Sequence, residues 1–136
     1  MPDSETKIVV IDHQAYWLGL SATALTDEGF SIYVHSRYDY PPPEIADGEK
    51  PDLVILGCPA IREEEQKLIE SVLAQDHHLL VLCTSLSMRT MRSLFLGGAS
   101  DVADKTFDPN RLVAVIKETL RRVKPETEIG DPEGRA

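Results

Sequence analysis

The sequence has few of the features that mark secreted, membrane or nucleic-acid-binding proteins. It contains only two cysteines, and no apolar run approaches the ~20 residues of a membrane-spanning helix. Acidic residues outnumber basic ones by 23 to 14, which gives a net charge of −9. Such a surface offers little to a nucleic acid or an anionic membrane. The polar start, residues 1–6, does not resemble a signal peptide. We therefore expect a cytoplasmic protein with reduced thiols.

The chain also lacks the short motifs of common enzymes and cofactor-binding proteins. Gly97-Gly98 is isolated, so no Gly-x-Gly-x-x-Gly or Walker-type loop is present. No Ser-His-Asp or Cys-His arrangement falls at the expected strand ends. Asp12 and His13 are adjacent, which does not fit the Asp-x-His-x-x-Gly loop of cobalamin-binding domains. These absences predict no enzyme, no metal and no cofactor. A cofactor-carrying flavodoxin-like domain is the alternative of a different class.

What the chain does contain is an alternation of apolar strands and amphipathic helices. Strands are expected at 7–11, 30–34, 53–56, 78–83 and 101–104, and helices at 14–28, 61–75, 87–96 and 108–122. Pro41-Pro42-Pro43 makes the stretch 36–50 irregular. The alternation predicts an α/β fold, with a doubly wound parallel sheet and helices on both faces. The domain should span 7–124, with disordered tails at 1–6 and 125–136, the second a tail or a linker.

Residue spacing also predicts which side chains face the core. In the helix that Ser87 would cap, Met88, Met91 and Phe95 are expected to point inward. Glu63-Glu64-Glu65 should face water, and His77-His78 should form a solvated turn without metal ligands at suitable spacing.

The central strand ends beside an unusual residue. Leu53-Val54-Ile55-Leu56 is unbroken and apolar, and Gly57 follows where the strand should emerge from the sheet. Chemistry in open α/β sheets gathers outside the carboxyl ends of the strands. A reactive side chain is expected at this position, and the sequence has none.

Several landmarks together give the sequence a family likeness. They are an acid after the first strand (Asp12), Pro51-Asp52-Leu53-Val54-x-Leu56 before Gly57, Thr84-Ser85 after the fourth strand, Gly98-Ala99-Ser100-Asp101 before the fifth, and Lys105 followed by Phe107-Asp108-Pro109. Over roughly 7–123 the chain resembles a bacterial response-regulator receiver domain, a module of two-component signal transduction and phosphorelays. The resemblance implies a flavodoxin-like sheet of strand order 2-1-3-4-5.

The resemblance also implies a chemistry that this sequence cannot carry out in full. Receivers accept a phosphoryl group from a kinase histidine on an aspartate that ends the third strand, where Gly57 stands here. They hold a divalent cation between that aspartate and two acids after the first strand, where this chain has Asp12 and His13, or Ile11 and Asp12 if the alignment shifts by one residue. Thr84 and Lys105 match the switch hydroxyl and the lysine. The resemblance thus points to a pseudo-receiver whose phosphorylation pocket is degenerate.

Individual residues of this pocket leave alternatives open. Asp12 and Lys105 either form a direct ion pair or are solvated remnants of the site. His13 is either a polar residue at a loop mouth or a metal ligand or pH-sensitive group. Cys58 and Cys83 are either small buried hydrophobes or a pair that responds to oxidation.

The resemblance finally indicates where a partner would bind. Receivers commonly use the face made by the helix at 87–96, the strand at 101–104 and the last helix for dimers and partners. Its candidate residues here are Arg89, Arg92, Leu96, Asp104, Lys117, Arg121 and Arg122. The sequence thus favours a non-catalytic module that binds a protein partner or itself. The alternatives are that it is the N-terminal regulatory domain of a longer transcription factor, or that this face is an ordinary mixed surface.

Overall fold

The computed structural model describes residues 6–42, 45 and 49–124 of the chain. The strands are β1 (Lys7–Ile11), β2 (Ser31–His35), β3 (Leu53–Cys58), β4 (Leu79–Cys83) and β5 (Asp101–Asp104), and the helices are α1 (Ala15–Asp27), α2 (Glu63–Ala74), α3 (Met88–Gly97) and α4 (Pro109–Val123). The predicted tail at 125–136 lies outside the described residues. Thr6 was expected in the N-terminal tail but is buried, and its carbonyl accepts the Ser31 N–H. Thr6 is therefore packed into the described fold.

The strands form one parallel sheet in the order β2-β1-β3-β4-β5, as the resemblance implies. Gly57 pairs with Leu82 and Cys58 with Cys83, so β3 extends two residues beyond its predicted end at Leu56. The apolar run Leu53–Leu56 marks only the part of the strand that hydrophobicity can reveal. Gly57 therefore lies inside the strand, within the hydrogen-bonded ladder, rather than after it.

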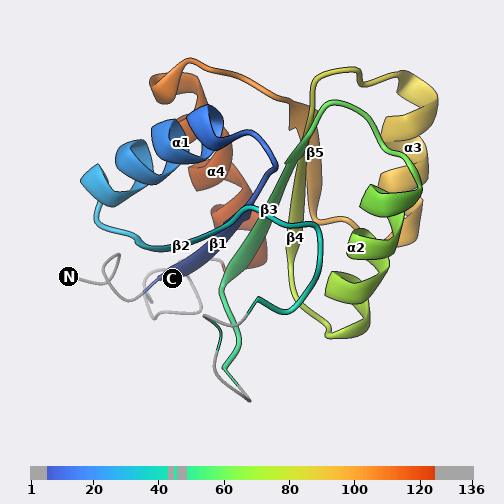
Figure 1. Ribbon diagram of the computed structural model, residues 1–136, viewed down its shortest axis with the longest axis horizontal. Helices are drawn as coiled ribbons and strands as arrows, with labels where there is room; N and C mark the ends of the chain where they lie inside the picture. Colours follow the sequence, from blue (N-terminus) through green and yellow to red (C-terminus); the bar gives the residue numbers. More distant parts are fainter. Residues whose placement is uncertain (1–5, 43–44, 46–48, 125–136) are drawn as a thin grey trace, which may run out of the picture.

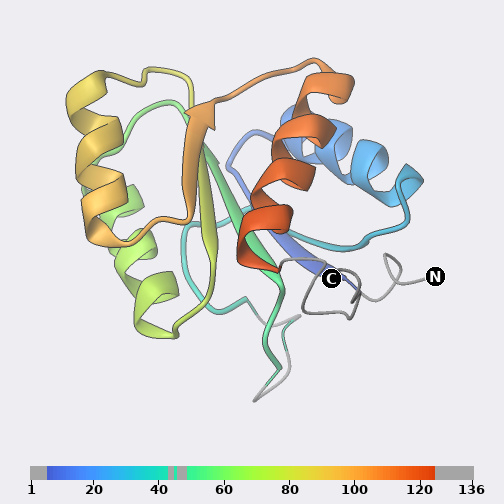
Figure 2. The ribbon, with the colours of Figure 1, turned by 180° about the vertical axis from the view of Figure 1, so that it is seen from behind.

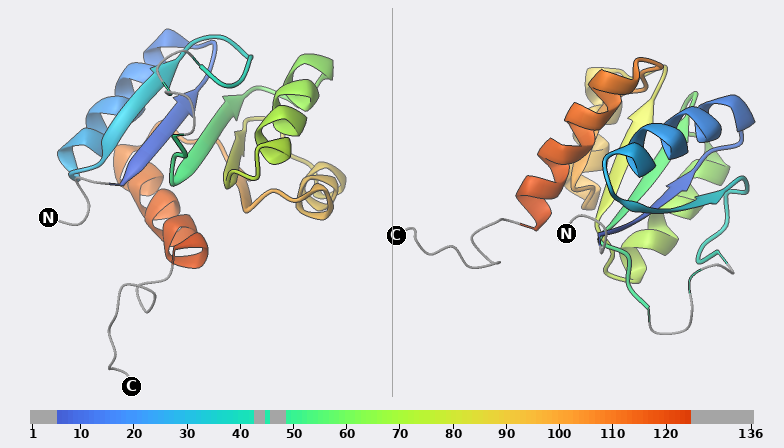
Figure 3. Two further views of the ribbon diagram at one scale, coloured as in Figure 1. Left: turned by 90° about the horizontal axis from the view of Figure 1, so that it is seen from below. Right: turned by 90° about the vertical axis from the view of Figure 1, so that its left-hand side faces the viewer.

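Two helical layers enclose the sheet (Figures 1 and 2). One face of the sheet packs against α1 and α4 through a core that includes Trp17, Leu25, Leu112 and Ile116. The other face packs against α2 and α3, and the view from below shows the sheet between the two pairs (Figure 3). Residues of β1, β3 and β4 alternate between the two cores, because successive side chains of a strand point to opposite faces. No helix within the described residues is long and apolar enough to cross a membrane.

The helix ends follow their sequence signals closely. The Ser87 side chain accepts the Thr90 N–H at the start of α3, and the Asp108 side chain accepts the Asn110 N–H just before Pro109. Gly98 ends α3 with φ at +115°, a conformation that other residues rarely adopt. Local chemistry therefore sets these boundaries.

The predicted faces of two helices need correction. Met88 is 81% exposed and Phe95 is 42% exposed, and Leu94 is the buried residue of α3 instead. This helix packs through a narrower stripe than its composition suggests. Glu65 is buried rather than facing water, because its carboxylate turns back to accept the Arg62 N–H at the start of α2.

The described residues that directly follow β2 form a loop. Residues 36–42, which we call the strap, leave the end of β2 and pass on the side of the sheet that α2 covers (Figure 1). Tyr38 of the strap is buried in the same core as Leu68 and Val72 of α2, and Tyr40 packs against it. The strap therefore covers part of the apolar surface on the α2 side of the sheet.

Candidate functional site

The carboxyl ends of β1, β3 and β5 meet at a buried ion pair. Asp12 follows β1 and Lys105 follows β5, and Lys105 Nζ lies 2.7 Å from Asp12 Oδ2. The two side chains are 2% and 3% exposed, respectively. Of the two alternatives for these residues, the structure has the direct ion pair. A buried pair of this kind is far less screened by salt than a surface pair.

Both charged groups of this pair have further neighbours. Asp12 Oδ1 accepts the Gln14 N–H at 2.8 Å, and Lys105 Nζ donates to Gln14 Oε1 at 2.9 Å. The ammonium also lies 5.1 Å from the centre of the Trp17 ring and 5.7 Å from that of Phe107, within the range of a cation–π contact. The Trp17 indole N–H donates to the Thr106 carbonyl. These contacts hold the lysine in one place.

Gly57 leaves room for the ion pair. A Cβ atom on Gly57 would lie 2.4 Å from Asp12 Oδ2 and 3.0 Å from Trp17 Cζ3. Both distances are shorter than ordinary contacts, and the nearer one ends on the atom that pairs with Lys105. The space that a side chain at position 57 would need is therefore filled by Asp12. Asp12 and a larger residue at position 57 cannot both keep these positions.

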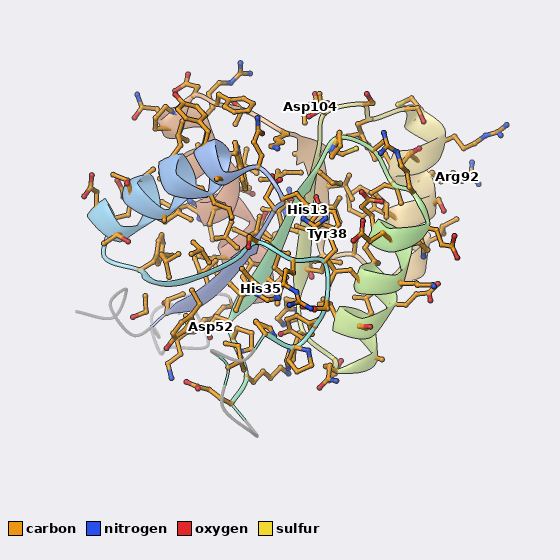
Figure 4. All side chains as sticks on the ribbon, viewed as in Figure 1. His13, His35, Tyr38, Asp52, Arg92 and Asp104 are labelled. Carbon is orange, nitrogen blue, oxygen red and sulfur yellow. The ribbon has the colours of Figure 1, made fainter. Side chains whose placement is uncertain are left out.

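His13 covers this pocket together with a tyrosine that the sequence did not single out. The His13 ring stacks on Tyr38 with ring centres 3.7 Å apart, and its Nδ1 lies 2.8 Å from the Ser36 carbonyl. His13 Nε2 lies 3.5 Å from a carboxylate oxygen of Glu64. The Tyr38 hydroxyl donates to the Gly57 carbonyl at 2.7 Å, and burial raises the pKa of Tyr38. Figure 4 shows His13 and Tyr38 side by side.

Thr84 is placed differently from the other predicted pocket residues. It is exposed, and its backbone N–H donates to the Cys58 carbonyl at 3.0 Å. Within the described residues its hydroxyl makes no hydrogen bond to Asp12 or Lys105. The structure thus joins Asp12, Gly57 and Lys105 in one buried group, with His13 at its edge.

The two cysteines lie side by side in the sheet. Cys58 of β3 and Cys83 of β4 are register partners, both fully buried and both free thiols. Burial and the neighbouring Cys83 raise the pKa of the Cys58 thiol. A thiol that stays protonated is a poor nucleophile, which favours the interpretation of these residues as small buried hydrophobes.

The residues that meet here do not suit a divalent cation. Asp12 is the one carboxylate of the group, and its Oδ1 and Oδ2 already face the Gln14 amide and the Lys105 ammonium. Mg²⁺ requires several oxygen ligands, whereas Gly57 supplies no side-chain oxygen and His13 offers nitrogen. Among the described residues, no group of three His, Cys, Asp or Glu residues is arranged to hold a metal.

The predicted interaction face divides into two parts. Arg89, Arg92 and Leu96 on α3 are exposed, and neither arginine forms an ion pair with any residue that the structure describes. Figure 4 shows Arg92 pointing away from the body of the protein and Asp104 at the end of β5. The predicted basic residues of α4 are paired instead: Lys117 with Glu28 of α1, Arg121 with Glu118, and Arg122 with Asp101 and Glu118. Among the predicted residues of this face that the structure describes, the cations without an ion pair are therefore the two arginines of α3.

His77 differs from the prediction of a solvated turn. It is half-buried, its Nδ1 lies 2.6 Å from the Tyr40 hydroxyl, and the two rings meet edge to face at 83°. His78 is exposed, as predicted, with a distant contact to Ser100. The sequence gives no sign of the Tyr40 contact, because its partners are 37 residues apart.

Comparison with known proteins finds likeness in structure but not in sequence. No family model matches the chain, and no curated protein matches it. A CheY-like receiver domain protein from Methanospirillum hungatei is 20% identical with a TM-score of 0.73, covering 89% of this chain and 98% of its own. The BeF3-activated N-terminal receiver domain of RstA from Klebsiella pneumoniae is 28% identical with a TM-score of 0.70, covering 85% and 98%.

A third neighbour is much longer than this chain. NtrX from Brucella abortus, solved with ADP, is 24% identical with a TM-score of 0.74 over 90% of this chain but only 29% of its own. Some neighbours are therefore parts of larger proteins. The strand order, the parallel sheet and these neighbours agree. This chain has the fold of the CheY-like receiver domains of response regulators.

Proposed function

We propose that this chain is a protein-interaction module of bacterial signal transduction that keeps the receiver fold and works without phosphorylation. The observation that supports this most directly is the buried Asp12–Lys105 pair, whose carboxylate occupies the space of a side chain at position 57. An aspartyl phosphate at this position needs a carboxylate that Gly57 does not have. The cation that assists phosphoryl transfer would also lack most of its oxygen ligands.

The module acts through its surface rather than through chemistry. The exposed part of α3 carries Met88 and Leu96, 81% and 78% exposed, together with Arg89 and Arg92. Large exposed apolar residues beside arginines are typical of protein interfaces. This surface belongs to the face that receivers commonly use, and we propose that it binds a protein partner or a second copy of the chain.

Phosphorylation independence is tested by treating the protein with Mg²⁺ and either acetyl phosphate or beryllofluoride. We expect the amide NMR spectrum to stay essentially unchanged, because position 57 has no acceptor. A receiver domain with an aspartate at the matching position, treated in parallel, controls for the activity of the reagents. Saturable shifts centred on Thr84 and Lys105 would refute the proposal.

A second candidate is the regulatory domain of a longer transcription factor. The observation that favours it is the likeness to NtrX, of which the matched region is 29%. If the native gene product extends beyond Ala136 into a DNA-binding domain, the same α3 surface would act on that domain. Sequencing the native transcript decides between the two.

A further inference from the structure

A shallow groove follows the outer side of α1, away from the sheet. Its volume is about 650 Å³, and residues from the first to the last turn of α1 line it together with Pro109 of α4. Tyr16 lies at one end, 71% exposed, and its ring stacks on Phe107, which is 45% exposed. Asp27 lines the other end. A mainly apolar groove with exposed aromatic rings is typical of a surface that binds another protein.

The exposed side of α3 is a second apolar surface. Of the six large apolar side chains that are exposed in the described part of the chain, three lie on α3 and two are Tyr16 and Phe107 at the groove. The two surfaces therefore hold nearly all of the exposed apolar side chains of this size. On α3 the three apolar residues share one side of the helix with two arginines; the five residues are Met88, Arg89, Arg92, Phe95 and Leu96.

The two surfaces lie on opposite sides of the molecule. α1 packs on one face of the sheet and α3 on the other, and Figure 1 shows the two helices on opposite sides of the view. The α3 helix therefore cannot reach the groove of its own chain. It can reach the groove of a second copy, because both surfaces are exposed.

The charges of the two surfaces are complementary in one orientation. Asp27 forms no ion pair with any described residue, whereas the neighbouring Glu28 is already paired with Lys117. The last turn of α1 contains no basic residue, so its terminal carbonyl groups add partial negative charge there. The first turn of α3 contains no acidic residue, and it carries Arg89, with Arg92 one turn later. An antiparallel arrangement of the two helices therefore brings cations to Asp27.

The lengths of the two surfaces agree with the same orientation. At a rise of about 1.5 Å per residue, Tyr16 and Asp27 lie about 16 Å apart along α1. Arg89 and Leu96 lie about 10 Å apart along α3 by the same rise. Helical side chains lean toward the N-terminus of their helix, so the long Arg89 side chain extends the reach of α3 toward Asp27. Leu96 at the other end then lies against Tyr16 and Phe107.

We propose that this chain self-associates head to tail, with α3 of one copy docked antiparallel in the α1 groove of the next. The inference rests on the proposed function, because it takes the α3 surface as the interface and names a second copy as its partner. The contact joins two different surfaces, so each complex still has a free α3 at one end and a free groove at the other. Association of this kind continues beyond a dimer unless the copies close into a ring.

The test reverses one charge on each surface and measures self-association of the full chain by sedimentation velocity. Asp27→Arg changes the groove and Arg89→Glu changes α3; both residues are exposed, so both variants should fold. We expect each variant to self-associate about tenfold more weakly than the unmodified chain, because like charges then meet in the contact. Asp27→Arg also makes the chain less negative, so a general effect of net charge would strengthen its association instead.

The double variant Asp27→Arg with Arg89→Glu carries the same ion pair in reverse. It should regain the association that each single variant loses. Glu70→Arg and Lys67→Glu make the same two changes of charge on α2, outside both surfaces, and are the matched controls. These two controls should associate like the unmodified chain.

Three results would overturn the inference, and each leaves the proposed function separately testable. If Asp27→Arg associates normally while Arg89→Glu does not, α3 is an interface but the groove is not its partner. If both single variants are weakened and the double variant stays as weak as Arg89→Glu, the two side chains do not pair. If the unmodified chain remains a monomer up to about 1 mM, the copies do not associate, and capture of a different protein through α3 decides the proposed function.

Discussion

Gly57 and Asp12 share one small space, and each determines what the other can be. The carboxylate of Asp12 lies where the first atom of a side chain at position 57 would be. A glycine at position 57 is thus required by packing around Asp12. The sequence predicts the missing acceptor, but it cannot reveal that a neighbouring residue has filled the space.

The packing requirement at Gly57 gives a prediction for Gly57→Ala. The added methyl group must displace Asp12 Oδ2 or Trp17, so we expect a loss of about 1–3 kcal/mol in the free energy of unfolding. Urea denaturation followed by Trp17 fluorescence measures it. Gly19→Ala is the matched control, because a Cβ atom in that helical position meets nothing within 4 Å. It should stabilise the protein by about 0.5–1 kcal/mol. Equal effects of the two variants would contradict this account.

Gly57→Asp follows from the same packing. We expect it to be less stable than the unmodified chain and to remain unphosphorylated by acetyl phosphate, because the new carboxylate meets Asp12 and the second strand-1 acid is still missing. Intact-mass spectrometry or a phosphate-affinity gel measures the product. Efficient labelling would show that Asp12 moves aside easily and that the alignment of Asp12 and His13 is wrong.

At the scale of elements, the Asp12–Lys105 pair joins the ends of two strands that are not neighbours in the sheet. β3 and β4 lie between β1 and β5, so the pair closes the carboxyl edge across Gly57. Lys105→Met alone leaves a buried carboxylate without its cation, and we expect a cost of about 3–5 kcal/mol. The double variant with Asp12→Asn should cost less than the sum of the two single variants.

The double-mutant cycle is read from the midpoints of urea denaturation. Lys67→Met, which removes an exposed lysine paired with Glu63 on the surface of α2, is the matched control. That variant should change stability by less than about 1 kcal/mol, because exposed pairs contribute little. Additive effects of Asp12→Asn and Lys105→Met would show that the two charges do not stabilise each other.

Elements were predicted best where local chemistry determines them. The caps at Ser87 and Asp108, the glycine after α3 and all four residues of β5 follow their sequence signals. The prediction for the core face of α3 is wrong. Residue periodicity indicates which side chains share one side of a helix, but not which of them a neighbouring element covers. The position of the strap cannot be predicted from the sequence, because its contacts with His13 and His77 join distant parts of the chain.

At the scale of the whole molecule, charge is distributed unevenly. The chain carries a net charge of −9, yet Arg89 and Arg92 lie exposed on α3 without ion-pair partners among the described residues. The proposed interface predicts that Arg92→Glu weakens self-association or partner capture by about tenfold, or about 1.4 kcal/mol. Sedimentation or a pull-down measures the loss. Lys67→Glu on α2 makes the same change of charge and should have little effect on binding. If Arg92→Glu also leaves binding unchanged, the α3 surface is not the interface.

The filled space beside Gly57 limits which substitutions this part of the protein can accept. A side chain at position 57 requires Asp12 to move. The Lys105 ammonium would then remain in a buried site without its carboxylate partner. We therefore expect a single substitution at Gly57, Asp12 or Lys105 to make the protein less stable. Under the proposed function, a phosphoryl acceptor at position 57 is therefore hard to introduce, because Asp12 and Lys105 already fill the space that it needs.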